Sequence, residues 1–301
     1  MGKKLSDDLK RNYLVYLMLL PVILYYLIFC YAPMYGAIIA FKDYRPGLSI
    51  LGSQWVGFKH FTQFFSSVYF SRLIKNTLAI SIYTTLWGFP APILLALMLN
   101  EVRSRYFKKT VQTLTYIPHF ISMVVVCGMI ANFSGTSGVF NDVIAFFGGE
   151  RAPLLGKPEL FRTIYIASGI WQSVGWGSII YLAAISGIDQ ELYEAATIDG
   201  AGRLRKAINV TLPSIMPTIL LLLILQIGGL LSVGYEKIIL LVNDLTLVKA
   251  DVISTYVYRK GLLDTNYSFS SAVGLFNSVI NFILLVVANS LSRRFAQTGL
   301  W

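Results

Sequence analysis

Six long stretches of the chain are apolar and carry no Asp, Glu, Lys or Arg in their interiors, which severely limits the possible folds. A helix needs about 20 mostly apolar residues to cross a bilayer. Each stretch meets that requirement, and together they cover residues 14–40, 77–100, 110–132, 163–187, 212–231 and 272–291. The pattern predicts an all-α membrane protein with six transmembrane helices. Residues 238–242 are also apolar but too short to span, so they extend the fifth span or form a re-entrant turn.

The composition excludes several other classes of protein. Hydrophobic residues make up 55% of the 301 residues and charged residues only 13%, about half the share in soluble domains. A soluble enzyme, a disordered chain and a nucleic-acid-binding protein are therefore excluded, despite the net charge of +10. Cys30 and Cys127 both lie in apolar stretches and indicate neither a disulfide nor a metal site.

The distribution of Lys and Arg predicts the orientation. Thirteen of the 25 lie in the N-terminus, the C-terminus and the loops 101–109 and 188–211. The other twelve are spread over the longer loops 41–76, 133–162 and 232–271. Since short basic loops stay inside, both termini are expected in the cytoplasm. The first apolar run is too long for a cleaved signal peptide and is interpreted as an anchor.

This topology divides the chain into four parts. They are a cytoplasmic segment 1–13, the first span with a long extracellular loop over 14–76, a core of five spans over 77–291, and a cytoplasmic tail 292–301. The extracellular loop has aromatic residues at helical spacing, which predicts either a helix lying in the outer interface or a docking surface for an external partner. These aromatic residues are Trp55, Phe58, Phe61, Phe64 and Phe65.

The loop between the fourth and fifth spans has the pattern of two short surface helices. Asp189 is a good N-cap, and acidic residues follow it in the first turn. Gly200 and Gly202 can end the first helix, and residues 203–210 can form a second, basic one. Pro213 is acceptable in the first turn of the next span. The loop is therefore predicted to be a helix–turn–helix along the membrane surface.

This loop resembles the EAA motif of permease subunits of ATP-binding-cassette (ABC) importers. The match is Glu-Ala-Ala-x-x-Asp-Gly-Ala followed by a spacer and Leu-Pro, and it runs through Glu194, Ala195, Ala196, Asp199, Gly200, Ala201, Leu212 and Pro213. The resemblance extends over nearly the whole chain and is nearest to the maltose-permease-like carbohydrate branch, including permeases for oligosaccharides released from polysaccharides. Many members have bulky aromatic residues where this chain has Leu204, Ala207 and Ile208.

The resemblance implies a type I ABC importer permease in a bacterial cell membrane, with the EAA segment as a cytoplasmic coupling helix. In this family that helix docks on a separate ATPase, and two ATPases bind ATP and Mg²⁺. A second, homologous permease completes the pathway, and an extracellular binding protein delivers the sugar. The chain has no Gly-x-x-x-x-Gly-Lys-Ser/Thr loop, so no ATP site, cofactor, metal or catalytic residue is expected in it.

A sugar site inside the membrane needs aromatic faces and hydrogen-bonding groups that face a cavity. His119, Ser173 and Trp176 also resemble sugar-contacting positions of the maltose-permease branch. Alternatively, such residues anchor span ends or join helices, and His119 is a neutral packing residue. The substrate-binding candidates are Tyr116, His119, Trp171, Gln172, Ser173, Trp176, Tyr235 and Asn277. Gly175 and Gly177 are expected to permit close helix packing.

The residues alone leave three alternatives open. One is an ABC permease for a non-sugar solute, and the other two are an ion-coupled secondary transporter and a membrane-embedded enzyme. An ion-coupled secondary transporter usually has carboxylates or histidines near the midplane, and the six stretches contain only His119. A membrane-embedded enzyme needs paired catalytic groups. The only orderly acidic pair is Glu194 and Asp199, which the EAA resemblance explains better.

Overall fold

The computed structural model describes residues 11–47 and 49–301, and within them nearly all regular structure is helical. Four segments are long and apolar enough to cross a membrane, or five when a bent pair is counted as one. The four segments are Tyr13–Phe41, Phe70–Glu101, Met123–Phe146 and Tyr267–Arg294. The all-α membrane class is confirmed, and by length and composition the described residues supply fewer spans than the six expected.

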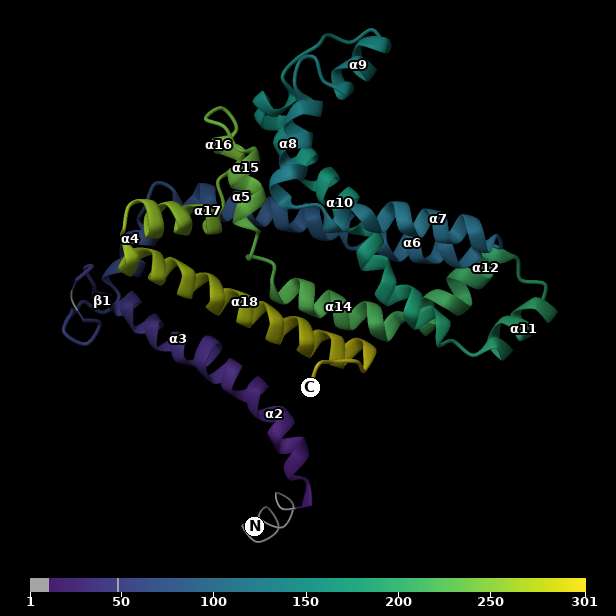
Figure 1. The fold of residues 1–301 in the computed structure, drawn as a ribbon, viewed down its shortest axis with the longest axis horizontal. Coiled ribbons are helices and arrows are strands. Elements are labelled where there is room, and N and C mark those ends of the chain that lie inside the picture. The colour runs from purple at the N-terminus through teal and green to yellow at the C-terminus, as the bar shows by residue number, and fades with distance from the viewer. Residues whose placement is uncertain (1–10, 48) are drawn as a thin grey trace.

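The first span is one continuous helical segment that packs against the body only at its far end. It consists of α2 (Tyr13–Tyr25), the π-helical turn η1 (Tyr26–Tyr31), α3 (Ala32–Met34) and the 3₁₀ segment η2 (Tyr35–Phe41). No residue of α2 is buried, and Figure 1 shows α2 leaving the body diagonally towards the N-terminus. Only η2 packs against α18 (Tyr267–Ala296). The exposed apolar surface of α2 therefore needs lipid or another protein to cover it.

The second, fourth and sixth apolar stretches form the long helices of the body. Helix α5 (Phe70–Tyr83), the π-helical turn η3 (Thr84–Gly88) and α6 (Pro90–Glu101) follow one another, and α10 (Pro158–Ser186) packs along α6. Helix α10 has 29 residues but is not among the four segments. The reason is its composition, because polar and small residues such as Gln172 and Ser173 occupy its middle.

The third apolar stretch, 110–132, is not one helix, and the expectation of a continuous span there is wrong. It divides into α7 (Arg105–Tyr116), the 3₁₀ turn η4 (Ile117–Phe120) and α8 (Met123–Ser134), which α9 (Val139–Phe146) follows. Pro118 cannot donate a backbone hydrogen bond. Ser122 then starts α8 afresh, because its side chain accepts a hydrogen bond from the amide of Val125. Helix α7 packs against α10, whereas α8 packs against α15 and leads to α9, which projects from the body in Figure 1.

The fifth stretch is bent where α14 (Met216–Gly228) begins. The segment Arg203–Ser214 and α14 meet at 62°. The segment Arg203–Ser214 consists of α12 (Arg203–Lys206), the π-helical turn η6 (Ala207–Thr211) and α13 (Leu212–Ser214). Pro217 has no N–H to donate to the carbonyl four residues earlier, so the helix is weakest at this point. Helix α14 then packs along α18.

The aromatic loop that follows the first span folds onto the body. Strands β1 (Lys42–Asp43) and β2 (Gln54–Trp55) pair antiparallel, and α4 (Lys59–Phe65) follows. Trp55 therefore lies in a strand, and Phe64 is only 1% exposed, in a cluster with Phe269 and Phe276 of α18. Helix α4 is short, and Phe58 and Phe65 at its two ends stay exposed, so a helix in the outer interface stays a prediction.

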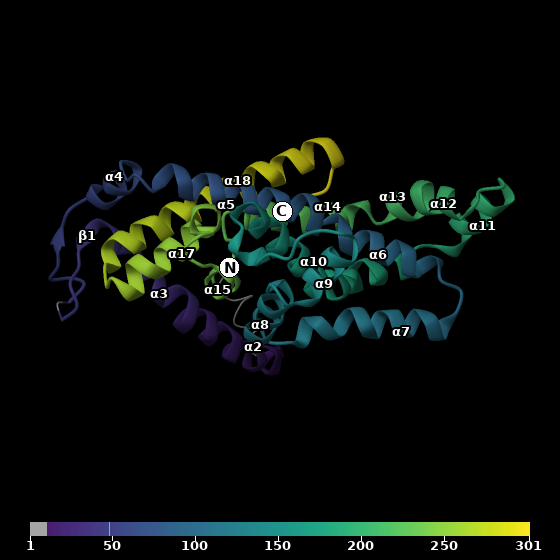
Figure 2. The same ribbon diagram turned by 90° about the horizontal axis from the view of Figure 1, so that it is seen from above.

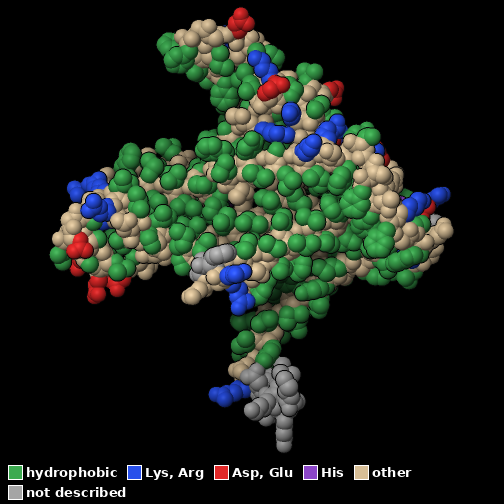
Figure 3. Space-filling view, turned by 180° about the vertical axis from the view of Figure 1, so that it is seen from behind, with side chains coloured by type: hydrophobic (Ala, Val, Ile, Leu, Met, Phe, Trp, Pro, Cys, Tyr) green, Lys and Arg blue, Asp and Glu red, His purple; other side chains and the backbone are tan. Residues whose placement is uncertain are grey.

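Short helices complete the fold, and the two ends of the molecule differ from its middle. These helices are η5 (Leu154–Gly156), α11 (Gln190–Ile198), α15 (Tyr235–Leu241), α16 (Leu247–Ala250), α17 (Ile253–Tyr258) and η7 (Arg259–Leu263). Figures 1 and 2 place α11 and α12 at one end, with β1 and α4 at the other. Figure 3 shows hydrophobic side chains across the broad middle and charged ones gathered towards the ends and the projecting arm, as a bilayer requires.

Candidate functional site

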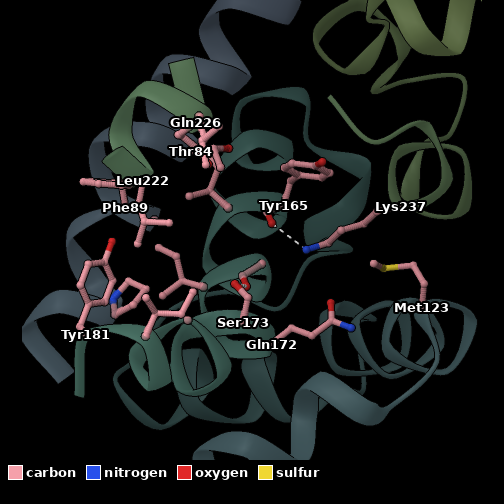
Figure 4. A pocket seen from close by; sticks show the side chains of 18 residues that line it. Thr84, Phe89, Met123, Tyr165, Gln172, Ser173, Tyr181, Leu222, Gln226 and Lys237 are labelled. Atoms are coloured by element: carbon pink, nitrogen blue, oxygen red, sulfur yellow. Dashed lines mark hydrogen bonds between the residues drawn. The ribbon is translucent and has the colours of Figure 1, made fainter. Parts of the chain in front are cut away.

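A cavity of about 640 Å³ lies against one face of α10, in the middle of the body. Helices α6, α8, α14 and α15 and the turn η3 contribute the other walls, and Figure 4 shows the side chains that converge on it. Most of the lining is apolar, which is typical of small-molecule sites. The polar or charged lining residues are Thr84, Tyr165, Gln172, Ser173, Tyr181, Gln226 and Lys237.

The α10 wall places two adjacent hydrogen-bonding side chains at the cavity. Gln172 and Ser173 both line the cavity, and Gly169 leaves room on the turn before them. The Ser173 hydroxyl donates to the carbonyl of Gly169 at 2.7 Å, and the Gln172 amide nitrogen lies 3.5 Å from the carbonyl of Ile121. The weakly held Gln172 amide is therefore available to other partners in the cavity.

Opposite this wall, Thr84 and Gln226 join the cavity to a smaller hollow of about 140 Å³. Within the part of the chain that the structure describes, the buried hydroxyl of Thr84 has no hydrogen-bond partner. The same holds for Ser81 and Thr85, which line the smaller hollow. Buried polar groups are usually paired, so unpaired hydroxyls beside a cavity favour a ligand that supplies hydrogen bonds.

Lys237 of α15 is the charged lining residue that sequence reasoning missed, as it also missed the polar lining residues Thr84, Tyr165 and Tyr181. Its side chain is buried, and its Nζ donates to the carbonyl of Tyr165 at 2.9 Å and lies 4.8 Å from the centre of that ring. Burial lowers the pKa of Lys237 to about 8, so the ammonium form still predominates at pH 7. The sequence signal was a lysine directly before the apolar residues 238–242, in a stretch interpreted as loop.

The structure separates the sequence-predicted sugar residues into several groups. Gln172 and Ser173 line the main cavity, whereas Tyr235 and Asn277 line another hollow of about 580 Å³ beside α17 and α18. Trp171 lines a mainly apolar groove against α8 and α9.

His119 and Trp176 lie together, outside the main cavity. Their rings stack with centroids 4.6 Å apart and an interplanar angle of 3°. His119 is exposed in this chain, and its ring packs on that of Trp176. Tyr116 is the last residue of α7 and is half-buried outside the main cavity.

The loop with the EAA motif has the predicted helix–turn–helix form. Asp189 caps α11 through a hydrogen bond from the amide of Glu191 at 3.0 Å. Gly200 has φ +73°, a conformation that side chains other than glycine rarely adopt, and it turns the chain towards α12. Tyr193 and Thr211 tie the two arms together through their hydroxyls at 2.9 Å.

The motif residues themselves are mostly solvent-facing. In the described residues, Glu194 and Asp199 form no ion pair, and Ile198 is 87% exposed between them. Leu204, in the second arm, is 74% exposed. Exposed apolar side chains on an otherwise polar loop indicate a surface for another protein. Leu212 and Pro213 form α13, at the bend before α14.

Residues 88–297 match the family of binding-protein-dependent transport system inner membrane components. The chain belongs to this family. It is 47% identical over 300 residues to the polygalacturonan/rhamnogalacturonan transport system permease protein YteP of Bacillus subtilis, covering 99% of this chain and 94% of that protein. It is 46% identical over 303 residues to protein LplB of the same organism, covering 100% and 95%.

Two solved structures resemble this family member closely. One is a bacterial ABC transporter involved in the import of the acidic polysaccharide alginate, with 48% identity, a TM-score of 0.89, and coverage of 97% of this chain and 99% of that one. The other is a bacterial alginate ABC transporter in complex with an alginate pentasaccharide-bound periplasmic protein, with 48% identity, a TM-score of 0.90, and coverage of 99% and 100%. This chain is a membrane permease of a sugar ABC importer, and it has the type I permease fold.

Proposed function

We propose that this permease carries an oligosaccharide through the cavity against α10 while a separate ATPase drives α11 and α12. The polar side chains of Thr84, Gln172, Ser173 and Gln226 form the part of the substrate path that this chain supplies. Tyr235 and Asn277 form a second contact region. The stacked rings of His119 and Trp176 contribute aromatic faces near the substrate path, and Tyr116 and Trp171 contribute two more.

The observation that carries the coupling proposal is the exposed helix–turn–helix at one end of the molecule. It combines apolar side chains open to solvent with the EAA motif, and no other element covers it in Figure 1. We infer that two ATPases bind ATP and Mg²⁺, that one of them binds this loop, and that a second permease pairs with this chain. A binding protein outside the cell delivers the sugar, which is supported by the solved relative in complex with an alginate pentasaccharide-bound periplasmic protein.

Six crossings with both termini in the cytoplasm complete the proposal. The four apolar segments are joined by α10 and by the bent unit of α12 to α14. This puts the EAA loop, which follows α10, on the cytoplasmic side with the ATPases. Its basic side chains, such as Arg203 and Arg205, then lie near anionic lipid headgroups.

The test is ATPase activity of the reconstituted importer, which contains both permeases, the ATPases and the binding protein. The wild type should respond to a sugar-loaded binding protein, whereas Gly200→Val should lose that response, because φ +73° strains a β-branched residue. Glu194→Lys should also uncouple hydrolysis from uptake. Gly202→Ala is the matched control, since Gly202 has φ −67° and open space around it. Normal uptake by Gly200→Val and Glu194→Lys would refute the coupling role.

A further inference from the structure

Lys237 carries the single charge among the residues that line the main cavity, as far as the described residues show. Its side chain is only 6% exposed. Removing a cation from water costs several kcal/mol unless the protein or a ligand compensates it. An ionisable group buried inside a membrane protein is usually functional. The cost of burying Lys237 therefore needs an explanation.

The protein supplies only part of that compensation. The ammonium donates one hydrogen bond, to the carbonyl of Tyr165 at 2.9 Å, and lies over the Tyr165 ring. An ammonium has three donors, so donors remain for another acceptor. Among the described residues no carboxylate forms an ion pair with Lys237, and its neighbour Glu236 is exposed.

The ammonium lies among the residues that line the cavity. Figure 4 shows the Lys237 ammonium entering between Tyr165 and Gln172, on the side that Ser173 also faces. A Cβ added at Gly169 would lie 3.4 Å from Nζ, so the glycine leaves the charge uncovered on this turn of α10. A ligand that reaches Gln172 and Ser173 therefore also meets the ammonium.

We propose that Lys237 determines substrate specificity by pairing with a carboxylate, so that the transported oligosaccharide contains uronic acids. This proposal rests on the proposed function, since it assumes that sugars pass through this cavity. A neutral sugar would leave the buried cation uncompensated, whereas a carboxylate neutralises it. A phosphate near its dianionic form would bring more negative charge than the one cation balances.

The test uses the purified assembly of both permeases and ATPases without the binding protein, so that discrimination by that protein does not enter. Tryptophan fluorescence is titrated with trigalacturonate and with its methyl ester, which differ mainly in charge. The wild type should bind the acid at least about tenfold more tightly. Lys237→Gln keeps a donor for Tyr165 but lacks the charge, so it should lose this preference. Lys237→Arg should retain it.

Lys249→Met is the matched control, because Lys249 is exposed and outside the cavity, and its preference should equal that of the wild type. Equal wild-type affinity for acid and ester would overturn the proposal, even if Lys237→Gln did not assemble. An equal loss of affinity for both sugars in Lys237→Gln would also overturn it, since it would show a structural role. Failure of the proposed function appears separately, as an importer whose ATPase no sugar-loaded binding protein stimulates.

Discussion

At the scale of single residues, the most connected charge in the described structure is the buried carboxylate of Asp251. It accepts hydrogen bonds from Arg72 at 3.1 Å and from Arg259 at 2.7 Å, and its exposed fraction is 0%. Asn76 donates to its main-chain carbonyl at 3.0 Å, and Arg162 donates to Asn76 at 2.7 Å. This network joins α5, α10 and the start of α17, and so fixes one end of the body.

Asp251→Ala should destabilise the protein strongly, because it leaves Arg72 and Arg259 without their partner in a part-buried site. Loss of one member of a buried ion pair typically costs about 3–5 kcal/mol. Thermal unfolding of the purified permease in detergent measures the effect. The control is Asp142→Ala, which breaks an exposed pair with Arg151 at 2.6 Å and should cost under about 1 kcal/mol. Equal shifts in the two variants would contradict the structural role of Asp251.

At the scale of elements, the packing of α7 against α10 depends on Gly175. A Cβ at this position would overlap the main-chain carbonyl of Thr115. Glycine lowers helix stability by about 1 kcal/mol relative to alanine, so close approach of the two helices is the reason to have it here. This contact holds α7 beside the helix that carries Gln172 and Ser173.

Gly175→Ala should therefore separate α7 from α10 and cost about 1–3 kcal/mol by overpacking. Gly128→Ala in α8 is the matched control, because no atom lies within 4 Å of the added methyl group, and it should leave stability unchanged or raise it slightly. Detergent melting curves and substrate uptake by the reconstituted importer compare the two. A Gly175→Ala variant as stable as Gly128→Ala would show that the helices can adjust.

At the scale of the whole molecule, the two charged ends and the apolar middle set the orientation in the bilayer. The loop with β1 and α4 lies at one end and the α11–α12 loop at the other. The sequence reasoning placed the second of these in the cytoplasm from the density of Lys and Arg. The two ends should therefore differ in their accessibility from outside the cell.

Single cysteines test this orientation in a background with Cys30 and Cys127 replaced by serine. Gln54→Cys, in exposed β2, should react with a membrane-impermeant maleimide on intact cells. Arg205→Cys, exposed in α12, should react only after the membrane is permeabilised. The cysteine-free protein gives the background signal. Labelling of Arg205→Cys in intact cells would reverse the topology and remove the coupling loop from the cytoplasm.

The sequence by itself determined the features that depend only on residues close to one another along the chain. Apolar stretches give membrane-spanning helices because a bilayer leaves few other ways to satisfy the backbone. Asp189 and Gly200 set the start and the turn of the α11–α12 loop because caps and positive φ are local requirements. By contrast, only the structure showed that α7 and α8 are separate helices on either side of Pro118.

Only the tertiary structure decided which distant residues share a site. Lys237 reaches the cavity because α15 packs beside α10, where the carbonyl of Tyr165, 72 positions earlier, accepts its hydrogen bond. The same packing put Gln172 in that cavity and Asn277 in another hollow. Polar residues in apolar stretches look alike along the chain. The cavity they face depends on how helices pack, which is a property of many side chains together.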